Sequence, residues 1–263
     1  ARVSTLRGLI PLRHLVEGDF TDSGHVSAHW RKGVKPVIAV TTALGYRVVC
    51  TPDHKIQRSD LTWVEAQCSI KDKVRLIPPT FAEKYHTVYF NDTPSMQSAI
   101  TVNDDIGRLL GYFMGDGSLY FGKGARHPLQ SHAELDICCT RRDQDVIENV
   151  CKLWMDVFGQ EPSRKVHKAG NAGGESVRHA YHTYGPFFYK LGALHRAGTD
   201  NKWMRKVCVP ECIWQSPRSV VREFLKGLYE SDGHIVKKQG TVLLFSKYPE
   251  FLRDVQLLLL GFG

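Results

Sequence analysis

Two aspartates occupy equivalent places in a repeated sequence pattern. Residues 109–119 read LLGYFMGDGSL and residues 225–235 read LKGLYESDGHI, so Asp116 and Asp232 lie 116 positions apart. Carboxylates are ligands that proteins offer to Mg²⁺. A metal ion held by carboxylates can activate water for hydrolysis of a phosphate ester. The repeated acids therefore predict a cation site with hydrolytic chemistry.

Helices must bring these two acids together. Each copy is an apolar run with small residues four apart, Gly111 and Gly115 in the first, Gly227 and Ser231 in the second. Small residues at this spacing form a smooth stripe along one helix face, which allows two helix backbones to come into contact. We expect the two motif helices to pack along these stripes.

The ends of both motif helices hold the acids. Gly117 and Gly233 follow them, and each suits the left-handed residue that commonly ends a helix. The last turn of a helix already carries partial negative charge. Side-by-side packing would place two carboxylates and two negative helix ends together, an arrangement that a bound cation stabilises. A single such string would be explained by packing and a helix cap alone, but the repeat favours a site.

The paired motifs resemble those of LAGLIDADG homing endonucleases in the single-chain form, over residues 101–263. This resemblance implies subdomains of order αββαββα whose curved four-stranded sheets lie in the DNA major groove. It also implies hydrolysis of both strands of a long double-stranded DNA target, with Mg²⁺ held by Asp116 and Asp232. The family's catalytic lysine precedes a proline, and Lys206 before Pro210 is the nearest match here.

The pattern around the first motif agrees with that order. After the motif we expect strands Leu119–Phe121 and Glu134–Cys139, helix Arg142–Phe158, strands Arg164–His167 and Val177–Tyr184, and helix Pro186–Leu194. The second copy restarts with strand Thr241–Phe245 and a helix from Ser246. Only 31 residues follow Asp232, so we expect its sheet to be incomplete.

Basic side chains near the expected strands are candidates for DNA contacts. Arg and Lys can read guanine edges from a ribbon in the major groove. Taken singly, each is better explained as a solvated surface charge. The candidates are Arg126, Arg141, Arg142, Arg164, Lys165, Lys168 and Arg178.

Residues 1–67 predict short strands and turns instead of helices. The runs Arg2–Ser4, Val34–Thr42 and Tyr46–Cys50 are rich in β-branched and aromatic residues, and Gly45 suits a hairpin turn. A single turn of helix is expected near Leu12–Leu15. Together with the second half, this makes the fold class α+β, with residues 1–100 as one domain and residues 101–263 as the other.

The string Thr51-Pro52-Asp53-His54 follows the last of these strands. In its context it resembles the TxxH block of the Hint domain in inteins and hedgehog-type autoprocessing proteins. That resemblance implies protein splicing, in which His54 protonates an amide nitrogen and Thr51 helps to hold the strained bond. The partners would be the flanking segments of a host protein. An intein opens with Cys or Ser and closes with His-Asn, whereas this sequence opens with Ala1 and its end lacks the His-Asn pair. We therefore expect an incomplete splicing domain that does not splice, with a genuine Ala-initiated intein as the alternative.

The composition permits a DNA-binding protein without requiring one. The 263 residues carry a formal net charge of +8, which suits a polyanionic partner. No apolar run could span a membrane, and the seven cysteines show no CxxC spacing, which predicts an intracellular protein with reduced thiols. The single-chain form of the resembled family implies a monomer. Cys208 and Cys212 leave zinc as an alternative. Two functional rivals remain: a non-catalytic DNA-binding relative of the maturase or regulator type, and a splicing module with a degenerate endonuclease.

Overall fold

The structure is a computed structural model, and it describes residues 1–90, 99–122, 128–130, 132–140, 142–166, 174–197, 202–205 and 207–263. The chain divides into two compact units. One comprises Ala1–Phe81 with Arg253–Gly263, and the other comprises Ala82–Leu252. The division falls at Phe81 instead of residue 100, and the backbone N–H of Ala82 donates to the carbonyl of Ser216 at 3.2 Å within the second unit.

The first unit has the short strands and turns predicted for its sequence. Its four-stranded sheet has the order β2-β1-β3-β4, and two separate hairpins follow. Gly45 forms the turn of the first hairpin with φ of 91°, a value that favours glycine. A 3-10 turn covers Leu12–His14. The strands are β1 (Arg2–Thr5), β2 (Gly8–Pro11), β3 (Phe20–Thr21), β4 (Gly24–His25), β5 (Ile38–Thr41), β6 (Arg47–Cys50), β7 (Lys55–Gln57) and β8 (Trp63–Glu65).

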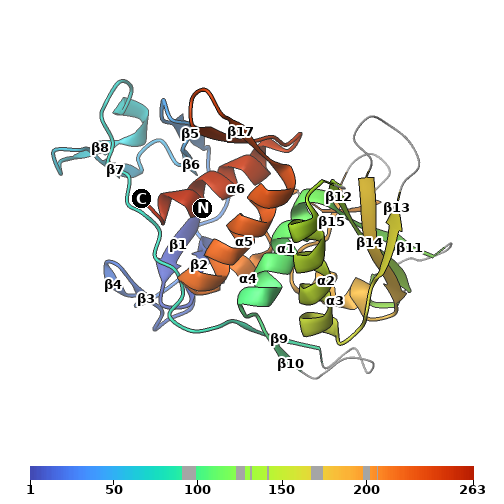
Figure 1. The fold of residues 1–263 in the computed structure, drawn as a ribbon. Helices are drawn as coiled ribbons and strands as arrows, with labels where there is room; N and C mark the ends of the chain where they lie inside the picture. Colours follow the sequence, from blue (N-terminus) through green and yellow to red (C-terminus); the bar gives the residue numbers. More distant parts are fainter. Residues whose placement is uncertain are drawn as a thin grey trace. The chain divides into compact units, whose positions relative to one another are not determined.

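The second unit contains the predicted helix–strand–strand alternation (Figure 1). Its antiparallel sheet has the order β11-β12-β14-β13, and the buried face carries Leu135, Ile137 and Val177. The elements are α1 (Asp104–Asp116), β11 (Gly117–Phe121), β12 (Ala133–Thr140), α2 (Gln144–Phe158), β13 (Ser163–Val166), β14 (Gly174–Tyr181) and α3 (Tyr184–Lys190).

The second copy of the pattern is shorter. The strands β17 and β18 pair only with each other in the described part of the chain, whereas the first copy has four paired strands. The final helix begins at Pro249 instead of Ser246, because proline is pre-organised for a first helical position. The remaining elements are β9 (Thr87–Tyr89), β10 (Ala99–Thr101), β15 (His195–Ala197), β16 (Lys202–Met204), α4 (Glu211–Trp214), α5 (Arg218–Asp232), β17 (Gly233–Val236), β18 (Thr241–Leu244) and α6 (Pro249–Leu260).

A side chain caps the start of α1. The Asn103 side chain accepts a hydrogen bond from the backbone N–H of Ile106 at 3.0 Å. Asp104 and Asp105 occupy the first turn, where negative charge complements the helix dipole. The motif helix therefore has a well-defined beginning, which helps to fix where its last residue lies.

Two simpler predictions can be compared directly. No helix among the described residues is long and apolar enough to cross a membrane. All seven cysteines lie in the described ranges, and none of them forms a disulfide there.

Candidate active site

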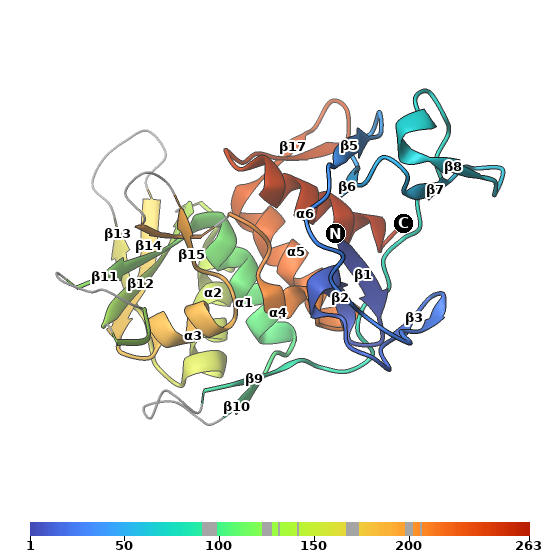
Figure 2. The same cartoon turned by 180° about the vertical axis from the view of Figure 1, so that it is seen from behind.

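The helices α1 and α5 pack backbone against backbone along their small residues. A β-carbon on Gly111 would lie 2.2 Å from the carbonyl oxygen of Phe224 and 2.7 Å from the amide nitrogen of Leu228. From the other side, a β-carbon on Gly227 would lie 2.4 Å from the Arg108 carbonyl oxygen. Figures 1 and 2 show the two helices side by side from opposite directions. The predicted packing of the motif helices is confirmed.

This contact continues to the last turn of both helices. A β-carbon on Gly115 would lie 1.7 Å from Oγ and 2.6 Å from Cβ of Ser231. The Ser231 hydroxyl is turned back onto its own helix, where it donates to the carbonyls of Gly227 (2.9 Å) or Leu228 (3.1 Å). Asp116 and Asp232 are the next residues, and both are partly exposed. They therefore end neighbouring helices at the same end of the pair.

The role predicted for the two closing glycines is wrong. Gly117 has φ −76° and ψ 154°, and Gly233 has φ −73° and ψ 147°, so both are extended and not left-handed. Their backbones instead pass too close to the preceding turn for a side chain. A β-carbon would lie 2.6 Å from the Phe113 carbonyl oxygen at Gly117, and 2.2 Å from that of Tyr229 at Gly233. Glycine thus allows each helix to pass directly into a strand.

Arg205 contacts the end of α1. Its Nη1 donates to the carbonyls of Met114 and Gly115, both at 2.7 Å. Burial lowers the pKa of Arg205, and the nearby Asp116 carboxylate opposes that shift. A fixed cation at a helix C-terminus offsets the negative helix end. The sequence interpretation had chosen Lys206, the next residue, which lies outside the described residues.

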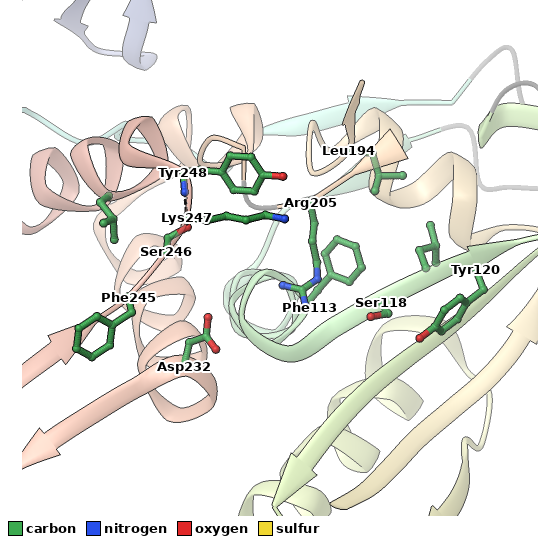
Figure 3. Close-up of a pocket in the computed structure, with 12 residues that line it drawn as sticks. Phe113, Ser118, Tyr120, Leu194, Arg205, Asp232, Phe245, Ser246, Lys247 and Tyr248 are labelled. Carbon is green, nitrogen blue, oxygen red and sulfur yellow. Dashed lines mark hydrogen bonds between the residues drawn. The ribbon is translucent and has the colours of Figure 1, made fainter. Parts of the chain in front are cut away.

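A cavity of about 770 Å³ opens beside these helix ends. Figure 3 shows the carboxylate of Asp232 on one side, Arg205 on another, and the Lys247 side chain reaching across the space. One carboxylate and two cationic groups can together receive a metal ion and a phosphate. The cavity is lined by Phe113, Ser118, Leu119, Tyr120, Leu194, Arg205, Asp232, Phe245, Ser246, Lys247, Tyr248 and Leu252.

The donor set suits magnesium better than zinc. Within the described ranges, no three His, Cys, Asp or Glu side chains gather closely enough to hold a metal ion. Structural zinc takes four protein ligands, whereas Mg²⁺ is commonly bound through one or two carboxylates with water and substrate phosphates. Asp116 and Asp232 fit the second pattern. The zinc alternative finds no support there, since Cys212 is buried and no third ligand joins Cys208 and His195, which lie 3.1 Å apart, among the described residues.

The open face of the four-stranded sheet carries two of the predicted DNA contacts. Strand pairing places Lys165 opposite Ser176 and Arg178 opposite Asp136, on the face away from the buried Leu135 and Ile137. Arg178 also forms an ion pair with Glu134 at 3.2 Å. Arg142 is exposed just before α2. The other loop candidates, Arg126, Arg141 and Lys168, lie outside the described residues.

The second copy of the motif lies in a stretch that matches a known family. Residues 219–263 match the family described as LAGLIDADG-like domain. Among solved structures, I-DmoI in complex with DNA and Mn is 20% identical with a TM-score of 0.42, covering 62% of this chain and 79% of that one. Mesophilic variants of the homing endonuclease I-DmoI are 19% identical with a TM-score of 0.39, over 60% of this chain and 72% of that one.

Curated relatives are much longer proteins. A 59-residue stretch is 39% identical to a probable translation initiation factor IF-2 of Thermococcus kodakarensis, over 22% of this chain and 5% of that protein. An alignment of 257 residues with the replicative DNA helicase DnaB of Synechocystis sp. is 24% identical, over 92% of this chain and 26% of the helicase. The chain thus spans about a quarter of these relatives' length or less.

One of the predicted DNA contacts, Arg164, lies on the helix-covered face of the sheet. Arg164 pairs in register with the buried Val177, on the helix-covered side. Its guanidinium forms a 2.5 Å ion pair with Glu175, which is 4% exposed, and donates to Gln144 at 3.0 Å. The period of two along a strand sends neighbouring side chains to opposite faces, so Lys165 and Arg164 cannot both face DNA. Arg164 instead neutralises a buried carboxylate.

The TxxH residues of the first unit lie in a turn after β6. The backbone N–H of His54 donates to the Thr51 carbonyl at 3.0 Å, and the His54 side chain is exposed. A hydrogen bond from the Thr51 side chain lowers the pKa of Asp53. The two residues are thus close in one turn, and the Thr51 hydroxyl is engaged with a carboxylate in this arrangement.

Proposed function

We propose that this chain is a site-specific DNA endonuclease that hydrolyses both strands of a double-stranded target. The observation that carries this proposal is the pair of carboxylates at the joined ends of α1 and α5, beside a cavity with cationic side chains. The match of residues 219–263 to the LAGLIDADG-like family supports it. Two motifs in one chain form the helix pair, so the proposed enzyme acts as a monomer.

Asp116 and Asp232 would hold the divalent ion, which we propose to be Mg²⁺. When bound, it activates water and stabilises the leaving oxygen. Arg205 fixes the end of α1, and Lys247 faces the cavity from which a phosphate would approach. Lys206 remains a proposed catalytic base or phosphate contact. Lys165, Arg178 and Arg142 would supply phosphate and base contacts from the sheet and its edge.

A plasmid assay tests the proposal. We propose below that the chain is an insert in a host protein, so the substrate plasmid carries the host coding sequence from which the segment encoding this chain is absent. The plasmid is incubated with the protein at increasing Mg²⁺ concentration. We expect linear product from the natural sequence, none from Asp116→Asn or Asp232→Asn, and unchanged product from Asp156→Asn on the exposed side of α2. Binding without cleavage at every metal concentration would favour the non-catalytic, maturase-type alternative.

The relatives support a second proposal, that the chain is an insert carried by a host protein. It matches segments within a translation factor and within a helicase, whose named activities have nothing in common. A shared segment in unrelated proteins is more simply explained as an insertion than as part of either activity. We propose that residues 1–81 belong to a splicing domain of the Hint type, inside the cell, with the host flanks as partners and with His54 and Thr51 in the cleavage chemistry.

Variants of this turn test the splicing proposal in a full-length precursor with both host flanks. His54→Ala should reduce cleavage at the N-terminal junction far more than it reduces folded yield, and Thr51→Ala should have a smaller effect in the same direction. Exposed His25 serves as a matched histidine control. Equal cleavage by the natural sequence and His54→Ala would leave this turn with a structural role only.

A further inference from the structure

A charged network crosses the interface between α1 and α5. Arg108 on α1 donates through Nη1 to Glu223 at 2.8 Å and through Nη2 to Glu230 at 2.5 Å, both on α5. Tyr112, one turn further along α1, donates its hydroxyl to Glu230. The Arg108 side chain is only 7% exposed, so its charge is held inside the helix pair. We call these four residues the Arg108 network.

The Arg108 network breaks the repeat symmetry of the two motifs. At the repeat offset of 116, Arg108 corresponds to Phe224 and Tyr112 to Leu228, which are both fully buried apolar residues. Symmetric packing of the two motifs therefore does not require it. Burying an arginine between helices generally stabilises less than apolar packing of the same volume would. A stability role alone does not explain why charge is placed there.

The glycine stripe leaves the lengthwise position of the helices weakly defined. On α1, glycines recur every fourth residue at Gly107, Gly111 and Gly115, and all three face the backbone or small residues of α5. A shift of α1 by four residues would again place glycine against Gly227 and Ser231. Such a shift moves one helix by about 6 Å along the other. It would separate Asp116 from Asp232 by the same amount, with glycine again opposite both small residues of α5.

The Arg108 network does not tolerate that shift. Glu223 and Glu230 are seven residues apart on α5, and Arg108 reaches both only from between them. A one-turn shift in either direction leaves one carboxylate of the buried network without its partner. Buried polar contacts of this kind are known to specify register between helices.

We propose that the Arg108 network is a positioning device that sets the register of α1 against α5 and thereby holds Asp116 and Asp232 level with each other. This inference rests on the proposed function. Arg108, Tyr112, Glu223 and Glu230 would act through the two acids and not on DNA itself.

The test removes the network charges with side chains of similar shape, in Arg108→Met/Glu223→Gln/Glu230→Gln. The matched control is Lys152→Met/Asp156→Asn, which removes an exposed ion pair on α2. In each background, the effect of Asp116→Asn on thermal unfolding is measured without metal. Level carboxylates repel, so Asp116→Asn should raise the unfolding midpoint in the natural and control backgrounds, and by less than half as much in the triple variant.

A second readout is the Mg²⁺ concentration at half-maximal cleavage, with DNA affinity measured separately. Displaced acids should raise that midpoint at least about tenfold in the triple variant, with DNA binding preserved. If the triple variant does not fold, Glu223→Gln alone should give a smaller shift in both readouts, since the pair of Arg108 with Glu230 remains.

The two readouts separate the failure of this inference from the failure of the proposed function. If the natural protein cleaves no substrate, the endonuclease proposal fails, and the metal-free comparison still decides the register. Equal effects of Asp116→Asn in the natural and network-free backgrounds would overturn the inference. So would no effect of Asp116→Asn in the natural protein, because the carboxylates would then not be held together.

Discussion

Substitution of Gly111 by alanine should disrupt the helix pair that carries both acids. The added β-carbon would lie 2.2 Å from the Phe224 carbonyl oxygen, whereas ordinary contact begins at 3.4 Å, so the helices must separate by about 1.2 Å. Because the obstacle is backbone, no side-chain rotation relieves it. Overpacking in a core costs about 1–3 kcal/mol, and alanine regains about 1 kcal/mol through helix propensity.

Because backbone cannot move aside, we expect the upper end of that cost, so the net loss of about 2 kcal/mol should lower the midpoint of thermal unfolding by roughly 4–8 °C. Plasmid cleavage should fall much more than the fraction of folded protein at the assay temperature, because the separated helices displace Asp116 from Asp232. The matched control is Gly122→Ala, where the added β-carbon meets no atom within 4 Å. Thermal unfolding and cleavage are measured on the same preparations.

Gly115 provides the decisive comparison. Its added β-carbon would collide with the side chain of Ser231, at 1.7 Å from Oγ, and not with α5 backbone. Gly115→Ala/Ser231→Gly exchanges the small residues across the interface and should recover most of the lost stability and cleavage. No single side-chain replacement on α5 should rescue Gly111→Ala. Unchanged unfolding of Gly111→Ala, or failure of the exchanged pair to recover, would refute close packing along this stripe.

Three further predictions concern single side chains. Arg205→Met removes charged hydrogen bonds to two α1 carbonyls, so it should cost roughly 2 kcal/mol of unfolding free energy and reduce cleavage. Full activity with intact stability would exclude a role of Arg205 at the site. Arg164→Met should lower the unfolding midpoint because it removes the ion pair of buried Glu175, and it should weaken DNA binding less than Lys165→Met does. The reverse order of the two variants in a binding titration would contradict the placement of Arg164. Burial lowers the pKa of His195 below its ordinary 6.5, so the folded state resists protonation and the free energy of unfolding should fall as pH drops below 6.5. His195→Gln should make that fall less steep in unfolding measurements. An unchanged pH profile would assign the fall to other groups.

The sequence was most informative where a spacing has one steric explanation. Gly111 and Gly227 predicted helix contact because residues four apart share a helix face, and the structure confirms it. The alternation of apolar residues along β12 likewise located the strand within one residue of its observed ends. These patterns depend only on the regular geometry of a single helix or strand, so they can be read from the sequence of that element alone.

The sequence was least informative where partners come from distant elements. Arg205 is not part of either motif, and its hydrogen bonds to Met114 and Gly115 join residues about 90 positions apart. Arg164 was assigned to the DNA-facing side because its charge suggested solvent, yet its partner Glu175 is buried on a neighbouring strand. Gly117 and Gly233 were correctly predicted to need glycine. The reason is that their backbones lie close to the preceding helical turn, and not that they are left-handed. Such causes become visible only when the neighbouring backbone is known.

The parallel arrangement of α1 and α5 collects negative charge at one end of the helix pair. Two carboxylates and two helix C-termini meet there, and each helix end contributes about half an elementary negative charge. Arg205 contributes one positive charge on the α1 side, and Lys247 faces the same cavity from the end of the second copy. Two single charges offset only part of about three negative ones, and both cations can also meet a phosphate. In the proposed function a divalent cation would complete the balance, and it would account for carboxylates at helix ends where a stability-driven sequence would place lysine.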